Sequence, residues 1–200
     1  MSSGATFERV YHELKRMLAE GELPPGSPIE PALIGKQIAS SITPIRDALH
    51  RLTGERLVEA PNHNGFRVPL PTETALRDLY EWNAQLVGLA ARRIRGPVEA
   101  NSAPDVGSGE DFGAATARLF VEIAREGGSA EHLRAIQRLN DRLAPFRRIE
   151  RKVLGGIAEE FRYLALHLAR GERATLIKLL DRYSRRRLSA VPQLLAAALY

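Results

Sequence analysis

The segment SSITPIRDALHRL, residues 40–52, brings hydrogen-bonding side chains together on one side of an expected helix. Its apolar residues recur at the three- and four-residue intervals of a helix face; they are Ile45, Ala48, Leu49 and Leu52. The opposite face carries a hydroxyl, a guanidinium and an imidazole, from Thr43, Arg46 and His50. A helix with one apolar face and a polar N-terminal end suits the reading of base edges in the DNA major groove.

Two preceding helices are expected to support this one. The first follows from an apolar stripe of helical period: Phe7, Val10, Tyr11, Leu14, Met17 and Leu18. The second covers about residues 31–39, and we expect Leu33, Ile34 and Ile38 to face inward. The third helix begins near Ser41 or Thr43, because either hydroxyl can cap it and Pro44 is tolerated in a first turn.

After Gly54 the pattern changes from helical to strand-like. The runs RLVEA and GFRVPL flank the turn-rich sequence PNHNG, which predicts a hairpin. Three helices followed by a hairpin is the order of a winged helix-turn-helix. The alternative on pattern alone is an ordinary three-helix core with a hairpin.

Three motifs stand in a fixed order within this segment: GELPPGSPI (21–29), SITPIRDALHRLTGERLV (41–58) and GFRV (65–68). On these motifs residues 7–70 resemble the DNA-binding domain of the GntR family of bacterial transcription regulators. The resemblance implies a recognition helix that carries Ser41, Thr43 and Arg46 and a wing with Gly65 at its tip. The chain departs from the family where Ile42 replaces a usual arginine, which removes one expected phosphate or base contact.

The resemblance implies a double-stranded DNA operator as partner. Arg46 would bond a guanine edge through two hydrogen bonds; its alternative is a surface ion pair with Asp47 or Glu55. Ser41 and Thr43 would bond phosphates at the helix N-terminus, and Gly65 would turn the wing through a positive φ. Two further residues complete the expected interface, His50 and Arg67. The alternative for His50 is a position beside the DNA without base contact, and the alternative for Arg67 is a solvated side chain.

The chain after the sequence VPLPTE (68–73) is expected to be a helical bundle. The fold class is therefore mainly α, with a winged helix-turn-helix in residues 1–70 and an all-α effector-binding and dimerisation domain in residues 71–200. We expect helices over 74–94, 111–126, 130–147, 149–169 and 171–188, followed by a short tail. The stretch 95–111 is rich in Gly, Pro and Ser and predicts a loop.

Residues 74–94 and 111–188 resemble the effector domain of the FadR branch of GntR regulators, often called FCD. The sequences LFVEIAREGGS (119–129) and EEFRYLALHLARGERATLIKLLDRY (159–183) carry this resemblance. Many members of that branch hold a divalent metal with one Asp and three His. This chain lacks one of their helices, and the expected loop at 95–111 stands in its place. The aligned ligand positions here are Thr116, Phe120, Phe161 and Tyr183, none a usual metal ligand.

We therefore expect no metal and no other cofactor, and a smaller, metal-free effector pocket. Its lining would comprise the four aligned residues together with Asn83 on the preceding helix. The aromatic rings would either close the pocket by packing together or surround an apolar ligand, to which the Tyr183 hydroxyl would offer a polar group. A shift in the alignment would leave them as plain core residues. His132 and His167 each stand alone, which is more typical of surface or core histidines than of ligands.

Composition narrows the remaining function classes. Residues 1–70 hold 8 Lys/Arg and 8 Asp/Glu, whereas residues 71–200 hold 21 and 16, so DNA binding would depend on a few placed cations. The chain has no cysteine, and no Gly-rich phosphate loop or Ser–His–Asp spacing is readable, so no enzyme is expected. No apolar run approaches a membrane span and no signal-peptide core appears, so a cytoplasmic protein is expected.

The sequence thus predicts a sequence-specific transcriptional regulator, a repressor or an activator. We expect a homodimer formed through the C-terminal domain, because one winged-helix module reads only a few base pairs. An unidentified small-molecule effector would occupy the helical domain. The alternative is a small-molecule-binding or protein-interaction helical protein with a degenerate DNA-binding module, which Ile42 and the neutral first segment favour.

Overall fold

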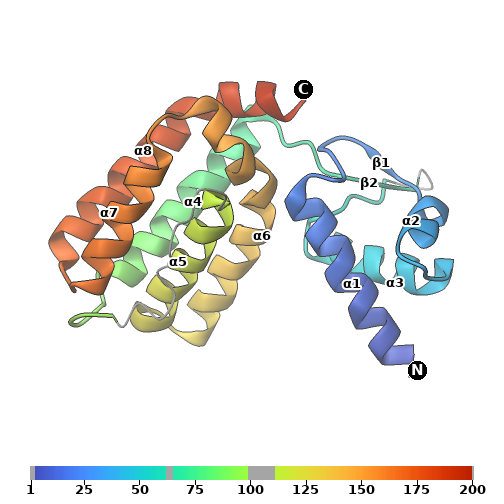
Figure 1. Ribbon diagram of the computed structural model, residues 1–200, viewed down its shortest axis with the longest axis horizontal. Coiled ribbons are helices and arrows are strands. Elements are labelled where there is room, and N and C mark those ends of the chain that lie inside the picture. Colours follow the sequence, from blue (N-terminus) through green and yellow to red (C-terminus); the bar gives the residue numbers. More distant parts are fainter. Residues whose placement is uncertain (1–2, 62–64, 99–110, 200) are drawn as a thin grey trace. The chain divides into compact units, whose positions relative to one another are not determined.

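The structure is a computed structural model that describes residues 3–61, 65–98 and 111–199 (Figure 1). The chain divides between Leu70 and Pro71 into two compact units, each with its own apolar core. Eight helices and one two-stranded sheet account for the regular structure of the described residues. The predicted fold class, mainly α with a winged helix-turn-helix before an all-α region, is confirmed.

The N-terminal unit is built on helix α1 (Ser3–Glu20), which packs against α3 (Ile42–Gly54) beside the short α2 (Pro31–Gln37). The predicted stripes of α1 and α3 meet in the core, where Leu14, Ile45 and Leu49 are fully buried. The prediction for Leu33 is wrong, because its side chain is 57% exposed. In this helix of only two turns the buried residues are Ile34 and Gly35, and Leu33 points about 100° away from Ile34.

The wing contains β1 (Pro28–Ile29) and β2 (Phe66–Arg67), which pair antiparallel. Glu59 pairs with Arg67 on the other side, through two backbone hydrogen bonds of 2.9 Å. The predicted hairpin is therefore present between residues 59 and 67, and the strand at 28–29, which was not predicted, adds to it. Gly65 has φ +77°, as predicted; residues 62–64 of the expected tip lie outside the described residues.

The second unit is a bundle of five helices, seen in green to red in Figure 1. They are α4 (Glu73–Ala91), α5 (Phe112–Gly127), α6 (Ala130–Val153), α7 (Ile157–Ala169) and α8 (Arg173–Ala198). Polar side chains cap three of the helix starts by accepting backbone hydrogen bonds, as N-cap residues commonly do; they are Thr72, Asp111 and Ser129.

Two boundaries differ from the prediction. Helix α6 continues through Pro145 to Val153, and the break falls at Gly156, which has φ +68° and precedes α7. Helix α8 continues through Pro192, so the expected separate tail is part of it. An interior proline removes one backbone hydrogen bond from a helix. Both prolines are nevertheless tolerated inside long helices that have buried residues before and after them. Most of the expected loop, 99–110, lies outside the described residues.

The bundle is closely packed where α5 ends against α4. A Cβ added to Gly127 would lie 1.9 Å from the Ala90 carbonyl oxygen, so only glycine fits there. The apolar core draws on all five helices, with Leu76, Ile136 and Val191 completely buried. Within the described residues, no helix has both the length and the apolar stretch that a membrane crossing requires.

Candidate functional site

The N-terminal end of α3 presents polar groups that the fold itself does not use. Ser41 is the N-cap residue by backbone position, yet its side chain makes no capping hydrogen bond. Ser41, Ile42 and Thr43 are all exposed, whereas the core-facing residues of α3 begin at Ile45. The backbone N–H groups of this first turn add a partial positive charge. This end of the helix is therefore available to an anionic partner such as a phosphate.

Arg46 lies one turn further along α3 and is exposed. It forms no ion pair or hydrogen bond with any residue in the described parts of the chain. The alternative partner Glu55 is engaged elsewhere: it accepts the Tyr11 hydroxyl at 2.8 Å and lies 3.5 Å from Arg51. The side chain of Arg46 is thus not committed to a surface ion pair with Glu55.

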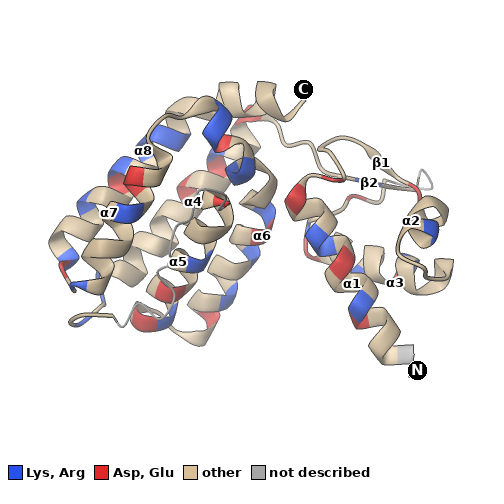
Figure 2. Cartoon of the chain, in the orientation of Figure 1, with Lys and Arg blue, Asp and Glu red and all other residues tan. Residues whose placement is uncertain are grey.

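Arg51 has a different environment, although it belongs to the same helix. Its guanidinium lies 4.0 Å from the centre of the Tyr11 ring, and Nη1 donates to Glu8 at 3.0 Å. Desolvation lowers the pKa of Arg51, but the hydrogen bond to Glu8 and the nearby Tyr11 and Glu55 outweigh it, so the pKa is raised. Figure 2 shows the acidic and basic residues that alternate along α1, to which Arg51 is tied. We therefore infer that Arg51 stabilises the contact of α3 with α1.

The wing lies against the same helix. The His50 ring contacts the edge of Phe66 on β2, with 5.0 Å between ring centres. Arg67 contributes its backbone to the strand pairing while its side chain is exposed. Lys36 on α2 is another exposed cation, which was not among the predicted DNA-binding residues. Helix α3 and the wing thus bring the predicted residues of this site into one unit.

The residues predicted to line the effector pocket lie in the interior of the bundle. All five are at most 4% exposed: Asn83, Thr116, Phe120, Phe161 and Tyr183. The Phe120 and Tyr183 rings meet edge to face at 5.2 Å, and Phe161 contacts Phe112 at 6.1 Å. Four helices, α4, α5, α7 and α8, supply these side chains. Ring packing encloses the region.

A buried guanidinium belongs to this region but was missed in the sequence. Arg147 on α6 is 2% exposed and donates to Asn140 at 2.6 Å and to Asn83 at 3.1 Å. It also lies 5.2 Å from the Phe120 ring centre. Three buried polar atoms of this region have no hydrogen-bond partner of good geometry among the described residues: Arg147 Nε, Asn83 Nδ2 and the Tyr183 hydroxyl. All three are donors, so this interior favours an acceptor group.

A second buried cation lies next to it. Arg187 on α8 donates to Glu150 at 2.8 Å, and Glu150 also accepts the Tyr80 hydroxyl at 3.0 Å. Glu160 on α7 pairs with both Arg187 and Arg186. Burial, followed by the charge of Glu150, raises the pKa of Tyr80 and of Tyr183. The network joins α4, α6, α7 and α8.

The sequence does contain a signal for these groups. Asn140, Arg147 and Glu150 fall at helical intervals from Ile136, Leu139 and Leu143, on the stripe that faces the core. Polar residues at core positions are the informative exception to a hydrophobic pattern. Arg187 likewise follows Tyr183 by four residues on the buried face of α8.

The two histidines weighed as ligands have other partners. The His132 ring is buried and lies 2.7 Å from the Leu86 carbonyl oxygen, measured from Nε2. His167 Nδ1 lies 2.5 Å from Glu172. Among the described residues, no group of three or more His, Cys, Asp or Glu side chains is arranged to hold a metal ion.

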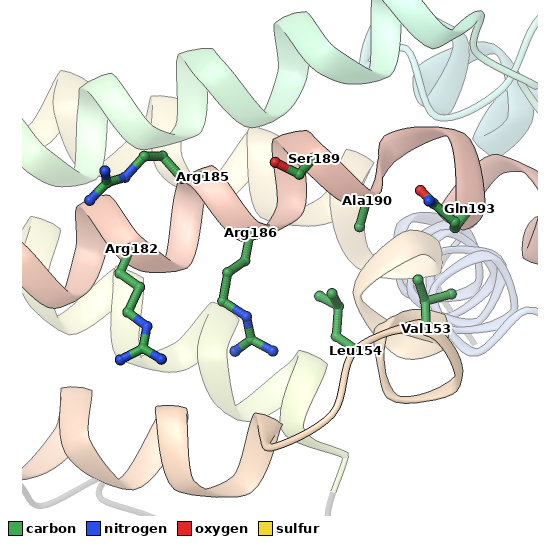
Figure 3. A pocket seen from close by; sticks show the side chains of 8 residues that line it. All are labelled: Val153, Leu154, Arg182, Arg185, Arg186, Ser189, Ala190 and Gln193. Carbon is green, nitrogen blue, oxygen red and sulfur yellow. The ribbon is translucent and has the colours of Figure 1, made fainter.

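A surface groove of about 550 Å³ follows α8 and the end of α6. Figure 3 shows Arg182 and Arg186 extending from α8 on the same side, with Leu154 beyond Arg186. Arg186 is held by Glu160 at 2.8 Å and by the Gly155 carbonyl at 2.6 Å. None of the predicted pocket residues lines this groove.

Comparison with known proteins decides the identity of the first unit. The family model of bacterial regulatory proteins of the gntR family matches residues 6–68, which span α1 to the wing. The first unit thus resembles a GntR-family domain over nearly its whole length. The motifs quoted from the sequence all lie within the matched segment, which makes up about a third of the chain.

Curated proteins that resemble this chain are named as transcriptional regulators. A probable D-xylose utilization operon transcriptional repressor of Paenarthrobacter nicotinovorans is 31% identical over 132 residues, 59% of this chain and 58% of that one. The repressor GlaR of Escherichia coli K12 is 33% identical over 87 residues, 42% of this chain and 40% of that one. The chain thus matches less than two thirds of the length of these relatives. Both names describe regulators and not enzymes.

Two solved structures share the fold over nearly the whole chain. A putative regulator from Rhodococcus sp. RHA1 superposes with a TM-score of 0.80 at 18% identity, covering 94% of this chain and 98% of that one. Escherichia coli McbR/YncC gives 0.68 at 18% identity, covering 96% and 99%. At this identity the likeness concerns the fold alone, and it includes the helical unit that the family model leaves unmatched.

Proposed function

We propose that the protein is a sequence-specific DNA-binding transcriptional regulator. The observation that carries this proposal is the exposed N-terminus of α3, with Arg46 uncommitted, inside a GntR-family domain. Helix α3 would enter the major groove, Arg46 would read a guanine, and Ser41 and Thr43 would bond phosphates. Gly65 and Arg67 would bring the wing to the adjacent backbone, and His50 would support the wing through Phe66.

The acting form would be a homodimer assembled through the helical unit. Trp82 and Leu89 on α4 are 50% and 43% exposed. They lie seven residues apart and therefore on one helix face. A second copy of the chain is the occupant we propose for this face, because an operator reader gains specificity from two related half-sites. Sedimentation equilibrium of the full chain tests this proposal. A monomer at tens of micromolar would contradict the homodimer, and a dimer that Trp82→Ser does not weaken would contradict the assignment of this face.

The helical unit would be the effector domain of the FadR-like, FCD type, without a metal. The interior around Asn83, Thr116 and Tyr183 would take a small molecule, with Phe120 and Phe161 rearranging to admit it. Its three unpartnered donors support a ligand that supplies acceptor atoms. A degenerate DNA module beside a working ligand site is the competing proposal, favoured only by Ile42 and the neutral charge of the first 70 residues.

Selection of duplexes from a random-sequence library by the purified chain separates these proposals. A regulator should enrich one sequence motif, with two related half-sites if it is a dimer. Its affinity should fall as salt rises, because phosphate contacts release counterions. A chain that enriches no motif at low salt would favour the competing proposal.

A further inference from the structure

We infer that Ile42 is a specificity-determining residue that recognises the 5-methyl group of a thymine. The inference rests on the proposed DNA-binding function and adds a base preference that Arg46 does not supply. Ile42 is the first residue of α3 and is 49% exposed. It lies between the exposed hydroxyl residues Ser41 and Thr43.

Packing of the domain does not account for this isoleucine. The core of the N-terminal unit includes Ile45, Ala48 and Leu49 of the same helix, together with partly buried Phe7, Leu23 and Ile38, but not Ile42. An exposed apolar residue alone is ordinary in proteins. This one, however, stands at the helix end that meets base edges when such a helix enters the major groove. Its contact surface is therefore a base pair in the bound state.

The chemistry of the major groove leaves one matching group. Guanine, adenine and cytosine present hydrogen-bond donors and acceptors there, and thymine alone adds an apolar methyl. An isoleucine over cytosine would cover an amino donor without offering it an acceptor, which costs free energy. Ile42 thus favours thymine by contact and disfavours cytosine by desolvation.

The position of the thymine relative to the guanine read by Arg46 is also fixed. Residues 42 and 46 are four apart and share a helix face, with about 5–6 Å between their Cβ atoms. Base pairs are about 3.4 Å apart along the duplex. The thymine should therefore lie one to two base pairs from the guanine in each half-site.

The test uses the duplex selected by the full chain, resynthesised with deoxyuridine at each thymine in turn. Deoxyuridine lacks the methyl and keeps the base pairing. One position per half-site should lose about fourfold in affinity, the equivalent of one buried methyl-sized group. Ile42→Ser should bind both duplexes equally, and Ile42→Val should keep the preference. Both variants alter an exposed side chain, and circular dichroism verifies their folding.

Two results overturn the inference while leaving DNA recognition intact. The wild-type chain could tolerate deoxyuridine at every position, or Ile42→Ser could show the same sensitivity as wild type. A sensitive thymine more than two base pairs from the guanine that Arg46 reads would contradict the geometry and overturn the inference as well. Failure to select any duplex would instead overturn the proposed function, and the inference with it.

Discussion

Arg187 and Glu150 form an ion pair inside the helical unit, with 2.8 Å between Nη2 and Oε2. Their side chains are 1% and 4% exposed. A second Arg187 nitrogen, Nε, donates to the same oxygen at 3.0 Å. The pair joins α6 to α8. Because neither side chain is hydrated, each charge is stabilised by the other.

Removal of one partner of this pair should therefore be costly. We expect Arg187→Met to lower the free energy of unfolding by about 3–5 kcal/mol, because it leaves a buried carboxylate without its cation. The double variant Arg187→Met/Glu150→Gln should lose less. Arg185→Met is the matched control: its pair with Asp181 is exposed, at 2.9 Å, and such pairs contribute under ~1 kcal/mol. Urea unfolding followed by circular dichroism measures all three, and equal losses would refute the argument.

Alkaline pH should destabilise the helical unit through its buried tyrosines. Burial, then the charge of Glu150, raises the pKa of Tyr80 and of Tyr183 above 10.0. The folded chain then retains protons that the unfolded chain releases, so this stability is complete below pH 10 and declines as pH rises further. Tyr80→Phe should flatten the decline, whereas Tyr163→Phe, at a 55% exposed position, should not. Absorbance of tyrosinate during a pH titration provides the measurement.

Two arginines of α3 should separate binding from stability. Arg46→Ala should weaken binding to the selected duplex by about 1–3 kcal/mol and leave the melting temperature unchanged, because the side chain has no partner among the described residues. Arg51→Ala should lower the melting temperature, because it removes the contacts with Tyr11 and Glu8. Fluorescence anisotropy with a labelled duplex and calorimetry distinguish the two. Equal affinity of Arg46→Ala and wild type would exclude Arg46 as a base reader.

Divalent metals should not stabilise the protein. None of the four positions that align with metal ligands in the resembling FCD domains carries a usual ligand of a divalent metal, and His132 already bonds the Leu86 carbonyl. Zn²⁺, Ni²⁺ and Mn²⁺ at tenfold excess should leave the melting temperature unchanged within about 1 °C. Metal analysis of protein purified without chelator complements this test. A stoichiometric ion, or a shift lost in His132→Ala or His167→Ala, would place a metal site that we did not identify.

Periodicity predicted the helices of this chain because their apolar faces are complete. The stripes from Phe7 to Leu18 and from Ile45 to Leu52 gave α1 and α3 to within a few residues. The strand Pro28–Ile29 was missed because two residues carry no alternation. The end of α6 was misplaced because the helix continues past Pro145 to Val153, where Leu154 is its C-cap and Gly156 precedes α7.

The interior of the bundle was harder to predict than its helices. The aligned positions Phe120, Phe161 and Tyr183 are buried, yet nothing in their spacing indicates the guanidinium of Arg147 among them. A long polar side chain on an apolar stripe is compatible with both a surface and a core position. Only the packing of α4 and α5 against α6 selects the core.

The two separate cores have an optical consequence. The chain contains one tryptophan, Trp82, and it lies on α4 of the helical unit. Intrinsic tryptophan emission therefore reports the melting of the bundle alone, whereas far-ultraviolet ellipticity sums both units. A gap between the two curves would show the N-terminal unit unfolding separately, so one melting temperature would not describe the chain.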